Sequence, residues 1–119
     1  MATQFKLKRA YEPALPDDGY RVLVDRLWPR GVSREKASLD AWAKDLAPST
    51  ALRKFFHQSP ENWAVFEAEY RHELANQAEE LDALRERARR EPVTLVYAAK
   101  DEEQNHARIL LDVLAEEDV

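Results

Sequence analysis

The residues best suited to chemistry lie close together in the segment RVLVDRLWPRG, which spans residues 21–31. They are Asp25, Arg26, Trp28 and Arg30. The two guanidinium groups can bind a phosphate or carboxylate through paired hydrogen bonds, and Asp25 could orient them or accept a hydrogen bond from a ligand. Structural roles are also open. Asp25 and Arg26 could form an internal ion pair that fixes the following loop, and Trp28 could fill the core, whereas Arg30 is harder to explain by packing.

A second polar group follows the apolar run VTLVYAA near the end of the chain. We expect Lys100 and Asp101 to open the last helix, whose N-terminus would offer free backbone N–H groups to an anion. Asp101 could also serve only as the N-cap. Asn105 and His106 would then lie about one turn into the helix, where His106 could be a catalyst or a hydrogen-bonded core residue. Tyr97 ends the preceding strand, and its hydroxyl could reach the site or only a backbone group.

Other common catalytic and metal sites find no support. The sequence has no cysteine, which excludes disulfides, zinc–thiolate sites and thiol nucleophiles. It has only two glycines, Gly19 and Gly31, so neither common glycine-rich phosphate loop is possible. His57 and His72 stand alone on helical segments, without a second ligand at the i+4 position. We therefore interpret both histidines as surface or packing residues and expect no metal and no cofactor.

Two strands must position these groups. Residues 20–27 contain three consecutive apolar residues, and residues 93–98 are β-branched and apolar, so each run is typical of a strand covered on both faces. The helical segment between them makes Val22–Leu27 and Val93–Ala98 expected parallel neighbours. In open parallel sheets, binding sites gather beyond the carboxyl ends of the strands. The two polar groups should therefore meet at one edge of the sheet.

The remaining pattern predicts a further strand at residues 5–8 and several helices. Ser49 is placed as the N-cap of a helix over residues 50–58. Apolar residues then recur at helical spacing from Trp63 to Leu84, and a capping pair predicts a break near Asn76. This order of elements predicts an α/β fold: a small, mostly parallel sheet with packed helices.

Composition limits the class of protein. The 119 residues fit one domain over residues 1–119, with 45% hydrophobic and 34% charged residues. The net charge of −5 argues against a general nucleic-acid binder. The sequence shows no apolar run of membrane-spanning length and no signal-peptide core, so we expect a cytoplasmic protein that does not bind membranes.

The motifs DGYRVLVDRLWPRG, AWAKDLAPST, LRKFF and LVYAAKDEEQNHARILLDVL resemble the YeaO-like branch of the domain-of-unknown-function 488 (DUF488) family. The resemblance covers nearly the whole chain and implies a small bacterial cytoplasmic α/β domain without an established activity. The resemblance implies that members of the wider family carry one cysteine at the end of the last strand. A second cysteine stands directly before a His-Arg pair on the following helix. The matching places here look like Tyr97 and Asn105-His106-Ala107, so thiol chemistry in such relatives does not carry over.

Three hypotheses about function follow. The first is a domain that binds a small anionic, nucleotide- or phosphate-like ligand; its candidate binding residues are Arg26, Trp28, Arg30, Tyr97, Lys100 and Asn105. The second is a hydrolase or transferase in which Asp25 or His106 is the general base and water the nucleophile. The third is a protein-interaction module without a small-molecule ligand. An open pocket flanked by Arg26 and His106 would favour the first two, and a ligand-free Asp25–Arg26 pair the third.

Overall fold

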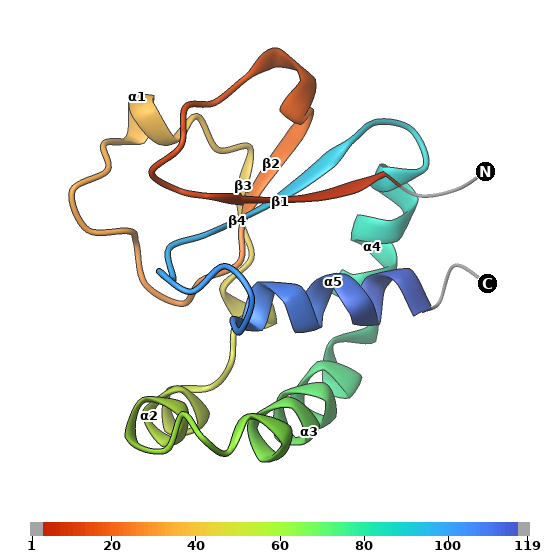
Figure 1. Ribbon diagram of the computed structural model, residues 1–119. Helices are drawn as coiled ribbons and strands as arrows, with labels where there is room; N and C mark the ends of the chain where they lie inside the picture. Colours follow the sequence, from red (N-terminus) through yellow and green to blue (C-terminus); the bar gives the residue numbers. More distant parts are fainter. Residues whose placement is uncertain (1–3, 117–119) are drawn as a thin grey trace.

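The computed structural model describes residues 4–116, which form a four-stranded sheet with helices packed against it (Figure 1). The strands are β1 (Phe5–Arg9), β2 (Tyr20–Leu23), β3 (Ala41–Trp42) and β4 (Val93–Tyr97). Their order across the sheet is β1-β4-β2-β3, and every pairing is parallel. The α/β fold predicted from the sequence is confirmed.

The predicted parallel pairing of the two buried strands is also confirmed, because β2 and β4 are direct neighbours. However, β2 ends at Leu23, four residues before the predicted end. The Val24 N–H still donates to the Val96 carbonyl (3.0 Å). At the next position the Asp25 carboxylate, rather than a backbone carbonyl, accepts from the Ala98 N–H (2.9 Å). The hydrogen-bond ladder between β2 and β4 ends there, and the chain continues as a loop beyond the edge of the sheet.

Five α-helices complete the described chain: α1 (Arg34–Ala37), α2 (Thr50–Gln58), α3 (Trp63–Leu74), α4 (Ala78–Ala88) and α5 (His106–Glu116). Three short 3₁₀ turns lie between other elements: η1 (Pro16–Asp18) between β1 and β2, η2 (Lys44–Leu46) between β3 and α2, and η3 (Ala75–Gln77) between α3 and α4. The predicted cap of α2 is confirmed, since the Ser49 Oγ accepts from the Leu52 N–H (3.2 Å). The predicted break near Asn76 is confirmed as η3 between α3 and α4.

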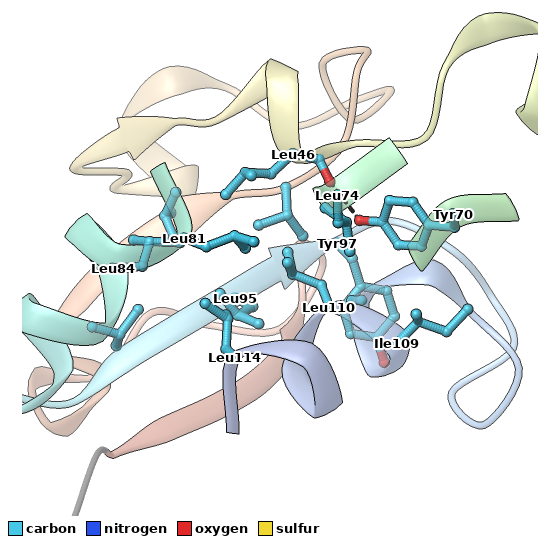
Figure 2. Packing of buried hydrophobic residues seen from close by; sticks show 14 of the residues in the cluster. Leu46, Tyr70, Leu74, Leu81, Leu84, Leu95, Tyr97, Ile109, Leu110 and Leu114 are labelled. Atoms are coloured by element: carbon cyan, nitrogen blue, oxygen red, sulfur yellow. Dashed lines mark hydrogen bonds between the residues drawn. The ribbon is translucent and has the colours of Figure 1, made fainter. Parts of the chain in front are cut away.

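The main hydrophobic core lies between the sheet and helices α3, α4 and α5, on the side where Figure 1 shows these helices gathered. Figure 2 shows Leu95 and Tyr97 of β4 packed with Ile109, Leu110 and Leu114 of α5. The other face of the sheet is covered by a smaller cluster around Leu23 and Val96, against which Trp28 and Trp42 pack. All five residues of β4 are buried, as expected for a strand covered on both faces.

The predicted start of the last helix is wrong. Helix α5 begins at His106, and its N-cap is Asn105, whose Oδ1 accepts from the Arg108 N–H (3.0 Å). Asp101 closes a separate turn by accepting from the N–H groups of residues 103 and 104 (2.9 and 3.0 Å). Aspartate forms such turns as readily as it caps helices. Lys100 is therefore exposed in a loop and lies at no helix N-terminus.

Within residues 4–116, no helix combines the length and the apolar character needed to cross a membrane.

Candidate functional site

A cavity of about 380 Å³ opens beyond the carboxyl ends of β2 and β4. Its walls come from the loops after β1, β2 and β4, from α2 and the residues just before it, from α3, and from the start of α5. The lining residues are Tyr11, Asp25, Arg26, Leu27, Trp28, Pro29, Arg30, Ala47, Pro48, Arg53, Phe56, His57, Phe66, Ala98, Ala99, Asn105 and His106. This is the edge at which the parallel strands were expected to bring the two polar groups together.

Most of the residues singled out from the sequence line this cavity: Asp25, Arg26, Trp28, Arg30, Asn105 and His106. Lys100 and Tyr97 are not among its lining residues. Lys100 is exposed in the loop before α5, and Tyr97 is 3% exposed within the helical core. Burial is the main cause that raises the pKa of the Tyr97 phenol, with a smaller contribution from Glu102.

Asp25 joins the ends of β2, β4 and α5. Its Oδ2 accepts from the Ala98 N–H (2.9 Å), and its Oδ1 lies 3.0 Å from His106 Nε2. The same Nε2 lies 3.0 Å from the Val24 carbonyl oxygen. A backbone carbonyl can only accept, so Nε2 carries a hydrogen. That hydrogen is directed at the carbonyl, which leaves Asp25 Oδ1 buried in close contact with the ring but without a directed hydrogen bond.

Arg26 is half-buried and holds the segment that leads into α2. Its Nε donates to the Pro48 carbonyl (3.1 Å), and its Nη2 donates to the Ala47 carbonyl (3.4 Å). Among the described residues it forms no ion pair with Asp25, whose Oδ1 contacts the His106 ring instead. The hypothesis of an Asp25–Arg26 ion pair is therefore wrong. Asp25 instead contacts the segments after β4 and at the start of α5, and Arg26 binds the segment before α2. The two side chains therefore fix different walls of the cavity.

Trp28 and Arg30 combine structural and exposed features. The Trp28 Nε1–H donates to the Val32 carbonyl (2.6 Å), and its ring meets Trp42 edge to face with centroids 5.5 Å apart. One side of this ring is thus part of the smaller core while another faces the cavity. Arg30 is exposed, and its guanidinium forms no ion pair within residues 4–116, although its carbonyl accepts from the Tyr11 hydroxyl (3.1 Å).

Helix α2 supplies cavity residues that the sequence did not identify. Arg53, Phe56 and His57 stand at positions i, i+3 and i+4, so they share one face of the helix. His57, interpreted as a surface or packing residue, is exposed and lines the cavity. The helical spacing was visible in the sequence, but nothing in it indicated which face of α2 meets the strand ends.

The chemistry of the cavity is cationic and apolar. Three arginines, Arg26, Arg30 and Arg53, line it against a single carboxylate, Asp25. Among the described lining residues there is no serine, threonine, cysteine or lysine, and the Tyr11 hydroxyl is engaged with a backbone carbonyl. No activated nucleophile is therefore at hand. Within residues 4–116 no cluster of three metal-ligating side chains forms.

Comparison with known proteins places these features in a family. The family described as "Inactive DUF488-N3 subclade" matches residues 4–118. The uncharacterized protein YeaO of Escherichia coli K12 is 49% identical over 107 residues, which cover 90% of this chain and 93% of that protein. The uncharacterized protein Rv3073c of Mycobacterium tuberculosis H37Rv is 40% identical over 112 residues, 94% of each chain. No solved structure matches.

Proposed function

Because this chain belongs to the DUF488 family, in the YeaO-like branch matched by the inactive DUF488-N3 subclade, we propose that it binds a small anionic ligand without converting it. The observation that carries this proposal is the cavity at the carboxyl ends of β2 and β4, whose lining contains three arginines and a single carboxylate. Its volume of about 380 Å³ suits a small molecule rather than a bare ion.

The charges of the cavity support an anionic ligand. The chain as a whole carries a net charge of −5, so a site with an excess of arginine stands out from the rest of the molecule. Arg30 and Arg53 are both exposed, and neither guanidinium forms an ion pair within the described residues. Free, planar cations at the mouth of a cavity are suited to phosphate or carboxylate groups.

A ligand screen with a matched pair of variants tests the proposal. Arg53→Ala removes a lining cation, and Lys54→Ala removes the same charge from the next, non-lining residue of α2. We expect at least one of inorganic phosphate, ribose 5-phosphate and adenosine 5′-monophosphate to raise the melting temperature of the wild type. A ligand at about 100 times its Kd adds about 2.7 kcal/mol of stability. The shift should shrink in Arg53→Ala and persist in Lys54→Ala.

The same ligand screen can also contradict the proposed anion binding. If none of the three compounds raises the melting temperature at millimolar concentration, the cavity is not a site for such anions. If both variants respond like the wild type, the anion binds elsewhere on the surface. Either result would contradict the proposal.

One observation favours a second candidate, a hydrolase or transferase. Asp25 and His106 lie 3.0 Å apart at the cavity, and both side chains are only 15% exposed, as in many acid–base pairs. Against it, the hydrogen on His106 Nε2 is directed at a backbone carbonyl, and the matched subclade is described as inactive. Turnover of a phosphate ester that is lost in His106→Gln would favour this candidate. The observation that would have favoured a protein-interaction module, a ligand-free Asp25–Arg26 ion pair, is absent from the described residues.

A further inference from the structure

Helix α2 offers two different chemistries to the cavity, one helical turn apart. Arg53 brings a guanidinium, and Phe56 brings an aromatic ring on the same face. The intervening residues, Lys54 and Phe55, carry the same kinds of side chain but do not line the cavity. The helix therefore contains both a cation and a planar apolar surface for a ligand, each with a natural control beside it.

The aromatic surface extends from α2 into the interior. The Phe56 ring lies 4.6 Å from the ring of Phe66, whose side chain is buried, and 5.4 Å from that of Trp63. From Phe66 the contacts continue to Tyr70 and then to His106, with ring centroids 6.0 Å apart at each step. Phe56, Phe66 and His106 line the cavity, so rings form much of its wall between α2 and α5.

Further apolar groups line other parts of the cavity. Leu27, Pro48, Ala98 and Ala99 line the cavity together with Trp28. Leu27 is 57% exposed, so the apolar surface reaches the mouth. A hydrated inorganic anion would gain nothing from these walls, because apolar surface is covered favourably only by another apolar group. The cationic and aromatic parts of the cavity together fit a ligand that has one charged end and one flat, apolar end.

We propose that the ligand is an organic anion with a planar aromatic group, of the chemical class of a nucleoside 5′-monophosphate. Its aromatic group stacks on Phe56, and its anionic group binds Arg53. Stacking on an aromatic side chain tolerates any flat ring and contributes substantially to nucleotide binding. This inference rests on the proposed function, because it names the kind of anion that the same cavity binds.

The test compares adenosine 5′-monophosphate with ribose 5-phosphate, which has the same charged group but no aromatic ring. Isothermal titration calorimetry measures both Kd values for the wild type and for Phe56→Leu, Phe55→Leu and Arg53→Ala. Leucine keeps apolar volume in place of either phenylalanine, each of which is half-buried against the core, so these variants should remain folded.

We expect the wild type to bind adenosine 5′-monophosphate at least about ten-fold more tightly than ribose 5-phosphate. Phe56→Leu should weaken the nucleotide by roughly ten-fold and leave ribose 5-phosphate unchanged, since only the stacking is lost. Phe55→Leu should change neither. Arg53→Ala should weaken both by roughly ten-fold, because both share the phosphate.

Two results overturn the inference while the proposed function stands. In the first, the wild type binds both compounds equally and Phe56→Leu changes nothing. In the second, Phe56→Leu weakens both compounds alike, which would indicate that Phe56 only shapes the cavity. If neither compound binds the wild type, the proposed function fails and the inference fails with it.

Discussion

At the scale of the residue, Asp25 connects several of the elements around the cavity. One carboxylate oxygen holds the end of β4 and the other contacts His106, while the Asp25 backbone carbonyl accepts from the Trp42 indole N–H (2.7 Å). Three segments distant in the sequence are thus tied to one side chain and its backbone. The sequence suggested two roles for Asp25, a site residue or half of an ion pair. In the structure it lines the cavity and also connects β3, β4 and α5 through its contacts.

Asp25→Asn tests this role. The asparagine oxygen can still accept from the Ala98 N–H, but its amide nitrogen must then face the Nε2–H of His106, so two donors meet. We expect the free energy of unfolding to fall by about 1–3 kcal/mol, measured by urea denaturation. Asp112→Asn on the exposed side of α5, where no partner is present among the described residues, should change it little. Equal stability of both variants would show that the contacts of the Asp25 side chain contribute little to the free energy of unfolding.

Arg26 lends itself to a second prediction. Its two hydrogen bonds run to neutral backbone carbonyls, so Arg26→Ala should cost about 1–3 kcal/mol of unfolding free energy. Had Arg26 been the buried partner of Asp25, removing it would leave an unpaired charge and cost about 3–5 kcal/mol. Urea denaturation separates the two values. A loss in the higher range would contradict the hydrogen bonds seen here.

At the scale of the element, α2 depends on α3 for its position. The Glu73 carboxylate of α3 accepts from both the backbone N–H (2.9 Å) and the hydroxyl (2.6 Å) of Ser49, the N-cap of α2. Leu52 is the one buried residue of α2, and Phe55 and Phe56 are half-buried against the core, so the helix lies at the edge of the core. The Glu73 carboxylate therefore helps to fix where Arg53 and Phe56 stand relative to the cavity.

Glu73→Ala should loosen α2 more than the rest of the protein. We expect faster amide hydrogen exchange in residues 50–58, with little change in β4, because two charge-assisted hydrogen bonds are lost at the start of the helix. Glu69→Ala is the control: it lies on the same helix, is exposed and has no partner among the described residues. Uniformly faster exchange throughout the protein would instead indicate a global loss of stability.

The elements also show what sequence reasoning can and cannot reach. The cap at Ser49 and the break near Asn76 were predictable, because local side-chain chemistry decides them. The start of α5 was not, because Asp101 and Asn105 are both good caps and only the buried position of Asn105 decides between them. The contribution of α2 to the cavity was also out of reach, since it depends on how α2 is held by α3.

At the scale of the whole molecule, a buried ionic cluster on the sheet face opposite α3, α4 and α5 fixes the loop between β1 and β2. Asp18 accepts from Lys8 Nζ (2.9 Å), Arg21 Nη1 (2.6 Å) and the Leu15 N–H (3.0 Å). Its backbone carbonyl accepts from the Thr94 hydroxyl of β4 (2.7 Å). Burial acts to raise the pKa of Asp18, but the hydrogen bonds from these three residues together lower it below its ordinary value of 3.8.

This lowered pKa predicts how stability depends on pH. The contribution of Asp18 is fully present above its ordinary pKa of 3.8 and is lost as the pH falls through the lower pKa of the folded state. Asp18→Asn should therefore be less stable than the wild type at pH 7, and the difference should narrow below pH 3.8. Urea denaturation over that range measures it. The neighbouring residue provides a control: the Asp17 carboxylate is 77% exposed and forms only a surface ion pair with Lys6, so Asp17→Asn should change stability little at pH 7.

The central claim is that the cavity at the strand ends binds an organic anion, and an NMR titration of ¹⁵N-labelled protein with adenosine 5′-monophosphate tests it most directly. The account predicts saturable shifts of the Trp28 indole N–H and of the backbone amides of Arg53 and Ala98, which line the cavity. The amide of Asp82 in α4, outside the cavity, should stay in place. An unchanged set of cavity signals at millimolar nucleotide, or shifts confined to residues outside the cavity, would contradict the claim.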